Sequence, residues 1–128
     1  MEIDTLETKP LLRKNKSLNA SPYTQNLPCL IEKMKHTHSW AKGELNAVVL
    51  MKSPNKQVIL TALHENTEIN SFQSNDSITL QIIEGKLKFQ SQEETVTIDK
   101  GQLLTFHEKV KYRLSAKEET VFLLTVAT

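Results

Sequence analysis

The chain has 128 residues, a formal net charge of +1 and one cysteine. The length fits a single domain, the near-neutral charge gives no field that would attract nucleic acid or an anionic membrane, and no apolar run approaches the length of a membrane span. We therefore expect no nucleic-acid and no membrane partner. A lone cysteine cannot form an internal disulfide, so we also expect a cytoplasmic protein.

Residues 1–28 are rich in turn-forming residues and contain three of the four prolines. Prolines and asparagines at this density disfavour a long helix or a central strand. We therefore predict a partly ordered N-terminal tail over residues 1–35, followed by one domain over residues 36–128. Within the tail, the apolar stretch 27–31 is predicted to add an edge strand, and a short helix within 30–39 also fits the sequence.

Four residues near this boundary carry potential chemistry. Cys29 lies in an apolar run and is interpreted as a packed thiol rather than a nucleophile. His36 and His38 have the spacing that places two side chains on one strand face, but no paired carboxylate accompanies them, so exposed or hydrogen-bonded histidines are the simpler interpretation. Trp40 is expected to cover one end of the domain rather than to stack on a ligand.

From residue 44 onward the pattern changes to short strands separated by turns. Apolar and polar residues alternate with period two, most clearly in residues 86–90. Turn signals recur roughly every eight to twelve residues, which predicts an all-β sandwich or barrel. The predicted strands cover residues 45–51, 57–64, 69–73, 77–84, 86–90, 95–98, 102–107, 111–114 and 120–127.

The positions of two glycines that end strands resemble the pattern of a known family. The stretch Ile78–Gly85 reads as a strand that ends in a tight turn, and Gly101 ends a second strand–turn unit. Glycine is favoured at such turns because a Cβ resists the backbone angles that they need. Residues 44–127 resemble the cupin superfamily, in particular its small single-domain bacterial members. The resemblance implies an all-β, cupin-type barrel, a double-stranded β-helix or jelly roll, with an irregular N-terminal segment.

The same motifs imply that the usual cupin metal ligands are replaced. When the motifs are anchored on the two glycines, the positions of the three histidines and the glutamate fall on Ser71, Gln73, Tyr112 and Ile78. Isoleucine has no lone pair, serine and glutamine are weak neutral ligands, and a phenol ionises only near a pKa of about 10. We therefore expect no metal and no other cofactor.

If the cupin register applies, alternate residues face a mostly apolar interior. This interior is either a small-molecule pocket or a barrel filled by its own side chains, and the sequence alone leaves both open. No catalytic residue is assigned. The residues predicted to line a candidate ligand pocket are Ser71, Gln73, Ile78, Leu80, Thr105, His107 and Tyr112.

Residues 120–127 are apolar on both faces, so this strand needs a layer on each side. In a one-domain chain with few helices, we expect that second layer to be another subunit. The sequence therefore predicts a homodimer formed by packing sheet against sheet. The apolar residues assigned to the other strand faces are Val49, Met51, Ile59, Leu63, Phe122, Leu124 and Val126.

Three functional hypotheses follow. The first is a metal-free cupin barrel without a catalytic centre, acting as a dimeric module that binds a small organic molecule or has a structural or regulatory role. The second is a metal-independent isomerase or epimerase in which Tyr112 and His107 serve as acid and base. The third is a metal-dependent cupin with unconventional ligands. The replaced ligand set favours the first and leaves enzymatic activity an open question.

Overall fold

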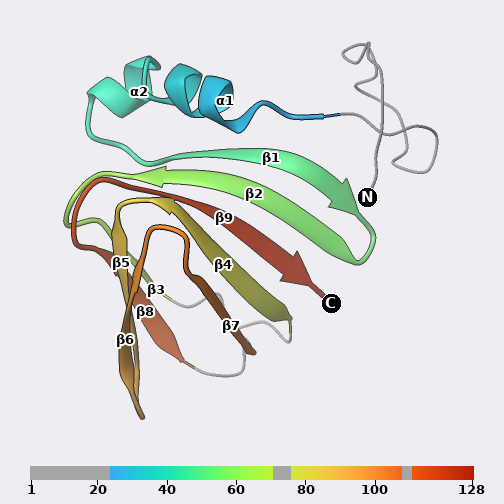
Figure 1. Cartoon of the computed structure of the whole chain (residues 1–128), viewed down its shortest axis with the longest axis vertical. Helices are drawn as coiled ribbons and strands as arrows, with labels where there is room; N and C mark the ends of the chain where they lie inside the picture. The colour runs from blue at the N-terminus through green and yellow to red at the C-terminus, as the bar shows by residue number, and fades with distance from the viewer. Residues whose placement is uncertain (1–23, 71–75, 108–110) are drawn as a thin grey trace. The chain divides into compact units, whose positions relative to one another are not determined.

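The computed structural model describes residues 24–70, 76–107 and 111–128, so the predicted pocket residues Ser71 and Gln73 lie outside the described residues. The chain divides into two compact units, residues 1–30 and residues 31–128. Strands dominate the second unit (Figure 1). Within the described ranges, no helix has both the length and the apolar character needed to span a bilayer.

The described strands form two antiparallel sheets (Figure 1). The five-stranded sheet has the order β1-β2-β9-β4-β7, and the four-stranded sheet has the order β3-β8-β5-β6. The alternating all-β pattern of the sequence is confirmed, with small shifts at the strand ends. The strands are β1 (Asn46–Ser53), β2 (Lys56–Leu63), β3 (Glu68–Asn70), β4 (Ser77–Glu84), β5 (Lys86–Ser91), β6 (Thr95–Asp99), β7 (Leu103–His107), β8 (Tyr112–Ala116) and β9 (Thr120–Ala127).

Two helices precede the strands, α1 (Leu27–Met34) and α2 (His38–Ala41). The predicted edge strand over residues 27–31 is wrong, because the side-chain Oδ1 of Asn26 accepts a hydrogen bond from the Cys29 backbone N–H and caps α1. Thr37 caps α2 in the same way, since its hydroxyl accepts from the Trp40 N–H. Cys29 is exposed, so its interpretation as a packed thiol is also wrong.

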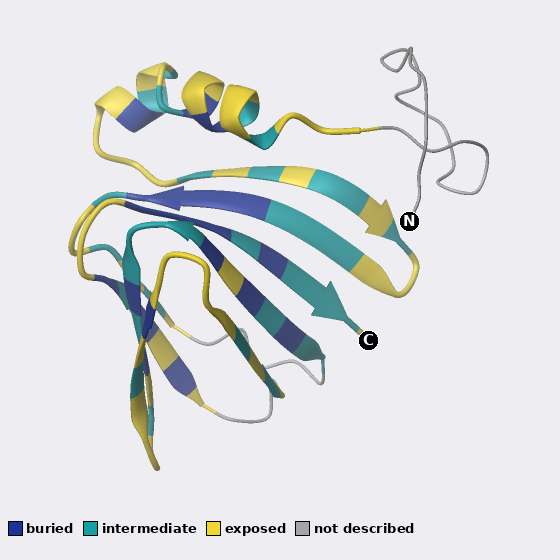
Figure 2. Ribbon diagram, in the orientation of Figure 1, coloured by how far each residue is buried: buried dark blue, intermediate teal, exposed yellow. Residues whose placement is uncertain are grey.

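The segment 31–41 covers part of the outer face of the five-stranded sheet (Figure 2). The Asn46 side-chain amide donates to the Met34 carbonyl and to the Thr37 hydroxyl, both at 3.2 Å. Asn46 pairs with Ala62, and residues opposite each other in an antiparallel sheet share a face, so the helices lie over this face. The layer expected from another subunit is supplied here by the chain itself. The buried residues of the two layers are Ile31, Met34 and Trp40 from the helices, and Leu60, Ala62 and Val121 from the sheet.

Two side chains fasten the helical segment to the strands. The Trp40 ring stacks on His64 with centroids 3.6 Å apart, and His64 Nε2 donates to the Trp40 carbonyl oxygen at 3.0 Å. Lys35 Nζ forms ion pairs with Glu84 Oε1 at 2.8 Å and with Glu119 Oε2 at 2.7 Å. Burial lowers the pKa of Lys35, but the hydrogen bonds and negative charges of the two glutamates outweigh it and raise the pKa above its usual 10.5.

The corner between β4 and β5 explains the first of the two signature glycines. Gly85 has a positive φ of 94°. A Cβ at this position would lie 2.6 Å from the Cα of Thr120 and would also strike the Glu119 carbonyl. The buried Thr120 hydroxyl accepts from the Lys86 N–H at 3.1 Å, which holds the two chain reversals together. Gly101 also has a positive φ, 85°, but open space surrounds its missing Cβ.

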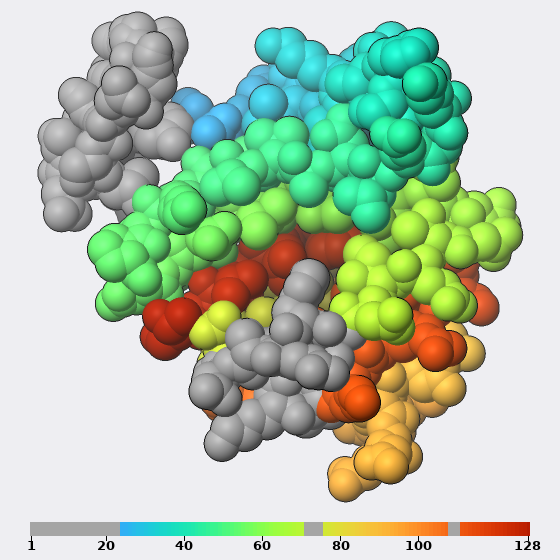
Figure 3. Space-filling view, turned by 180° about the vertical axis from the view of Figure 1, so that it is seen from behind, coloured from blue at the N-terminus to red at the C-terminus, as the bar shows by residue number. Residues whose placement is uncertain are grey.

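The two sheets meet differently along their two sides. On one side the turn between β6 and β7 joins them, and Gly101 N–H donates to the Ile82 carbonyl at 2.8 Å. On the other side lie β1 and β3, which are the first strands of their sheets. Both of these strands reach the surface on the face shown in Figure 3. We call the side at the β6–β7 turn the joined side of the barrel, and the side at β1 and β3 the open side.

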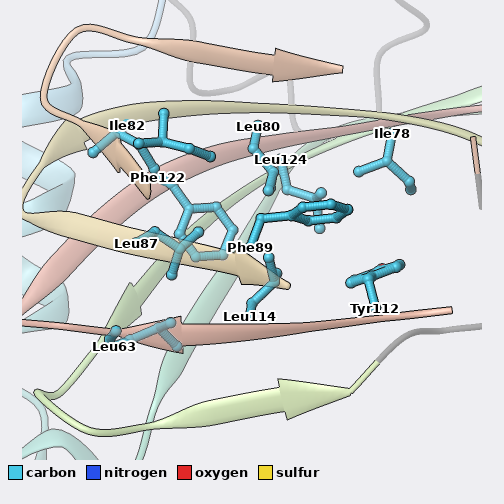
Figure 4. Close-up of a cluster of buried hydrophobic side chains, with 12 residues drawn as sticks. Leu63, Ile78, Leu80, Ile82, Leu87, Phe89, Tyr112, Leu114, Phe122 and Leu124 are labelled. Carbon is cyan, nitrogen blue, oxygen red and sulfur yellow. The ribbon is translucent and has the colours of Figure 1, made fainter. Parts of the chain in front are cut away.

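The core lies between the inner faces of the two sheets (Figure 4). Ile78 and Leu80 of β4 point inward, and their register partners on β9, Val126 and Leu124, do so as well. The assignment of the apolar β9 residues to the outer face is therefore wrong, as it is for Val49, Ile59 and Leu63, which also lie on the inner face. The outward residues of β9 are instead Val121, Leu123, Thr125 and Ala127.

Candidate functional site

A cavity of about 300 Å³ lies between the sheets. Six strands and the residue preceding β1 form its wall. Its volume falls at the lower end of the range of small-molecule sites. The lining residues are Leu45, Ala47, Ile59, Thr61, Ile69, Ile78, Leu80, Tyr112, Leu114, Phe122 and Leu124.

The wall of this cavity is almost entirely hydrocarbon. Thr61 and Tyr112 are the two lining residues with hydroxyl groups, and no lining residue is Lys, Arg, His, Asp or Glu. Ile78 of β4 and Tyr112 of β8 lie at the same end of the core on opposite sheets (Figure 4). Such a surface offers dispersion contacts and removal of apolar area from water, with few groups for polar recognition.

The cavity belongs to the open side of the barrel. Ala47 of β1 and Ile69 of β3 line it from the two edge strands, and Leu45 leaves 45% of its surface exposed. Val49 pairs with the cavity-lining Ile59, so it shares the inner face, yet it is 54% exposed. The apolar wall therefore continues along β1 into solvent.

The joined side of the barrel is packed. The rings of Phe89, Phe106 and Tyr112 contact one another, with centroid distances of 4.9 Å, 5.6 Å and 4.7 Å. No described residue of β5, β6 or β7 lines the cavity. Edge-to-face and offset aromatic contacts of this kind fill volume densely. Tyr112 marks the border, because it belongs both to the aromatic cluster and to the cavity wall.

The predicted pocket residues are only partly brought together. Ile78, Leu80 and Tyr112 line the cavity. Thr105 and His107 were predicted to face inward, but they are exposed on the outer face of β7. The register explains this, because buried Ile78 pairs with Phe106, which makes the neighbours of Phe106 point outward. His107 therefore does not share the interior with Tyr112.

No protein-family profile and no curated protein matches the sequence. Solved structures do. A protein of unknown function from Streptococcus pyogenes matches with a TM-score of 0.63 at 20% identity, covering 68% of this chain and 76% of that one. A cupin superfamily protein from Desulfitobacterium hafniense matches with a TM-score of 0.63 at 11% identity over 66% of this chain and 77% of that one. A cupin-2 domain protein from Shewanella frigidimarina matches with a TM-score of 0.62 at 13% identity, covering 81% of this chain and 94% of that one.

This chain has the cupin fold. The resemblance inferred from the two glycines is thus confirmed at the level of architecture. Identities of 20% and below show a shared fold and carry no activity or ligand from one cupin to another.

The described part of this barrel interior does not fit a resident metal ion. At the glutamate position of the first cupin motif, Ile78 presents only carbon to the cavity, and the donor at the second-motif histidine position is the phenol of Tyr112. In the described part of the chain, no three His, Cys, Asp or Glu side chains come close enough to share an ion. His36 and His38 do not reach the interior, since both are exposed.

Sequence reasoning missed the contribution of β1 and β2 to the cavity. Ala47, Ile59 and Thr61 line it together with Leu45 and Ile69. Every second residue of 57–63 faces inward, but this stretch is apolar on both faces, so no polarity alternation marks the lining residues. Motif anchoring drew attention to β4 and β8 instead, because the family's known ligands lie there.

Proposed function

We propose that this protein is a metal-free cupin module that binds a small organic molecule without converting it. The apolar cavity of about 300 Å³ on the open side carries the proposal. An interior of carbon surface offers binding energy, at about 25 cal/mol per Å² of apolar surface buried. Among the described lining residues there is no acid–base pair and no cluster of charges. Binding and release, used for transport, sensing or regulation, match these properties.

The isomerase hypothesis receives no support from the geometry. A proton-transfer pair must reach one substrate from within hydrogen-bonding distance. Tyr112 is buried between the sheets, whereas His107 is exposed on the outer face of β7. Tyr112 is the one titratable residue among the described residues that line the cavity.

Titration with N-phenyl-1-naphthylamine, a neutral dye whose fluorescence rises in apolar surroundings, tests this proposal. We expect saturable binding of one dye per chain, with one ring system in the cavity and the other along the exposed apolar residues at its rim. Replacing Ala47 by Phe fills the rim of the cavity and should weaken dye binding at least tenfold. Gln90→Phe adds the same ring to the exposed outer face of β5 and is the matched control.

Three outcomes would overturn the proposal. The first is a wild-type protein that shows no saturable dye binding although circular dichroism reports a folded chain. The second is a control variant, Gln90→Phe, that weakens binding as much as Ala47→Phe, which would place the dye elsewhere. The third is one Fe, Mn, Ni or Zn per chain in elemental analysis of the purified protein, which would end the metal-free assignment.

We further propose that the active form is a homodimer built on the uncovered part of the outer face of the five-stranded sheet. There, β9, β4 and β7 present three cross-strand rows of side chains, and Thr79 and Thr105 hydroxyls lie 3.5 Å apart at the centre. None of the nine residues carries a formal charge, although 24% of the chain is charged. The rows are Ala127–Ser77–His107, Thr125–Thr79–Thr105 and Leu123–Gln81–Leu103.

A flat, uncharged face suits a partner with the same surface, as a two-fold symmetric contact requires. Light scattering at micromolar concentration should give twice the chain mass. Thr79→Lys places two like charges near the symmetry axis and should yield monomers, whereas Gln90→Lys on the other sheet should stay dimeric. A monomeric wild-type protein would refute the dimer and leave the ligand proposal untouched.

A further inference from the structure

The lining of the cavity and the exposed stripe beside it define a ligand class. This inference rests on the proposed function. We propose that the ligand is an uncharged, mainly aliphatic molecule that enters sideways between β1 and β3 and leaves its far end against the stripe formed by Leu45, Ala47 and Val49.

The charge of the ligand follows from the residues of the wall. The eleven lining residues include no cationic or anionic side chain. A carboxylate or ammonium group moved into such a wall would lose its hydration without gaining an ion pair, which is strongly unfavourable. A hydroxyl or carbonyl group costs far less and can remain at the open end in water. An uncharged ligand is therefore favoured over an acid or an amine with the same carbon chain.

The size of the ligand follows from the volume. At roughly 30 Å³ for a water-sized group, a cavity of about 300 Å³ holds about ten non-hydrogen atoms. The stripe adds room beyond the cavity, because Leu45 and Val49 are 45% and 54% exposed. A ligand longer than ten atoms can lie along this stripe, but there it stays half in contact with water and gains less per added atom.

The route follows from where the described apolar wall meets solvent, and two other directions are closed by packed residues. Aromatic packing of Phe89, Phe106 and Tyr112 fills the joined side. At the end covered by the helical segment, Leu63 and Phe122 have almost no exposed surface. The exposed apolar residues next to the cavity, Leu45 and Val49, lie on the open side, so an apolar ligand meets its wall there first.

Displacement of bound N-phenyl-1-naphthylamine by compounds of equal chain length tests the ligand class. We expect 1-decanol to displace the dye at least tenfold better than decanoate or decylammonium at pH 7.4. Across 1-hexanol, 1-octanol, 1-decanol and 1-dodecanol, affinity should rise about fourfold per methylene and then more slowly once the cavity is full, near ten atoms. Equal displacement by decanol and decanoate, or an affinity that does not change with chain length, would overturn the inference.

A charge on the stripe tests the route. Val49→Lys should weaken 1-decanol binding several-fold and relieve the rejection of decanoate, whereas Gln90→Lys on the opposite sheet should change neither. If Val49→Lys leaves both affinities unchanged, the proposed route is wrong. These outcomes separate from those of the proposed function: saturable dye binding without the alcohol preference refutes this inference alone, and absence of dye binding refutes the binding function itself.

Discussion

The joined side and the open side of this barrel are built from the same two sheets, yet they are filled differently. On the joined side, three aromatic rings pack with centroids 4.7–5.6 Å apart. On the open side, residues of moderate size such as Ala47, Thr61 and Ile69 leave a cavity of about 300 Å³. The fold therefore separates two tasks, since one side provides the close packing that stabilises the barrel and the other side remains available for a ligand.

This difference predicts unequal costs for removing side chains. Phe89→Ala on the packed side should lower the free energy of unfolding by about 3–5 kcal/mol, because it leaves a void between fixed neighbours. Ile69→Ala on the cavity wall should cost no more than about 1.5 kcal/mol, since Ile69 is only partly buried and already borders empty space. Urea unfolding at pH 7 measures both values. Equal losses would show that the two sides are packed alike.

Alanine substitution at the two signature glycines should lower the free energy of unfolding by different amounts. Gly85→Ala should cost at least about 3 kcal/mol, because the new Cβ strikes the Glu119–Thr120 backbone in addition to the strain of a positive φ. Gly101→Ala has the same backbone strain with open space around it, so about 1–2 kcal/mol is expected. Thermal unfolding of the pair checks the ranking, and a Gly101 variant that is the less stable of the two would contradict it.

A larger side chain should lower the free energy of unfolding in the packed core but not at the rim of the cavity. Ala116 of β8 is 1% exposed within the core, so Ala116→Leu should overpack it and cost about 1–3 kcal/mol. Ala47→Leu grows into the cavity rim and should change stability by less than about 0.5 kcal/mol. Chemical denaturation compares these two variants. A loss at Ala47 as large as that at Ala116 would mean that the cavity is not open to an added side chain.

The smallest expected effect is at Lys35, which ties the helical segment to Glu84 and Glu119. Lys35→Met should cost about 0.5–1 kcal/mol at pH 7, as for other partly exposed ion pairs. Because the folded pKa of Lys35 is raised above 10.5, its contribution is fully present below pH 10.5 and is lost as the pH rises through the folded pKa. Unfolding measured between pH 7 and pH 11.5 should therefore show the wild type approaching the variant. A gap that stays constant over this range would argue against the ion pairs.

The positions of the strands along the chain could be predicted from the sequence because side-chain alternation in a half-buried strand is a local property. The register of β7 could not be read so simply. Anchoring on Gly101 placed Thr105 and His107 inside, although the aromatic residue in this strand is Phe106. The larger gain from burying Phe106 decides the face, and it was the better signal.

The cavity itself could not be predicted from the sequence. Composition described an apolar interior, but whether that interior is filled depends on how far apart the two edge strands lie, which is set by packing across the whole barrel. The N-terminal helix was predicted only in part, as a short helix within residues 30–39, and its first turn was predicted as a strand. The apolar run from Leu27 to Ile31 resembles a strand, and the capping residue Asn26 that starts a helix there was read only as a turn former.

Xenon bound in a crystal of this protein would distinguish the open side from the joined side, because xenon enters apolar cavities and gives an anomalous signal. We expect a xenon site on the open side, in contact with Ile59, Ile78 and Leu124, and none among Phe89, Phe106 and their neighbours. A crystal structure in which side chains fill the space next to Ile78 and xenon finds no site there would contradict this expectation.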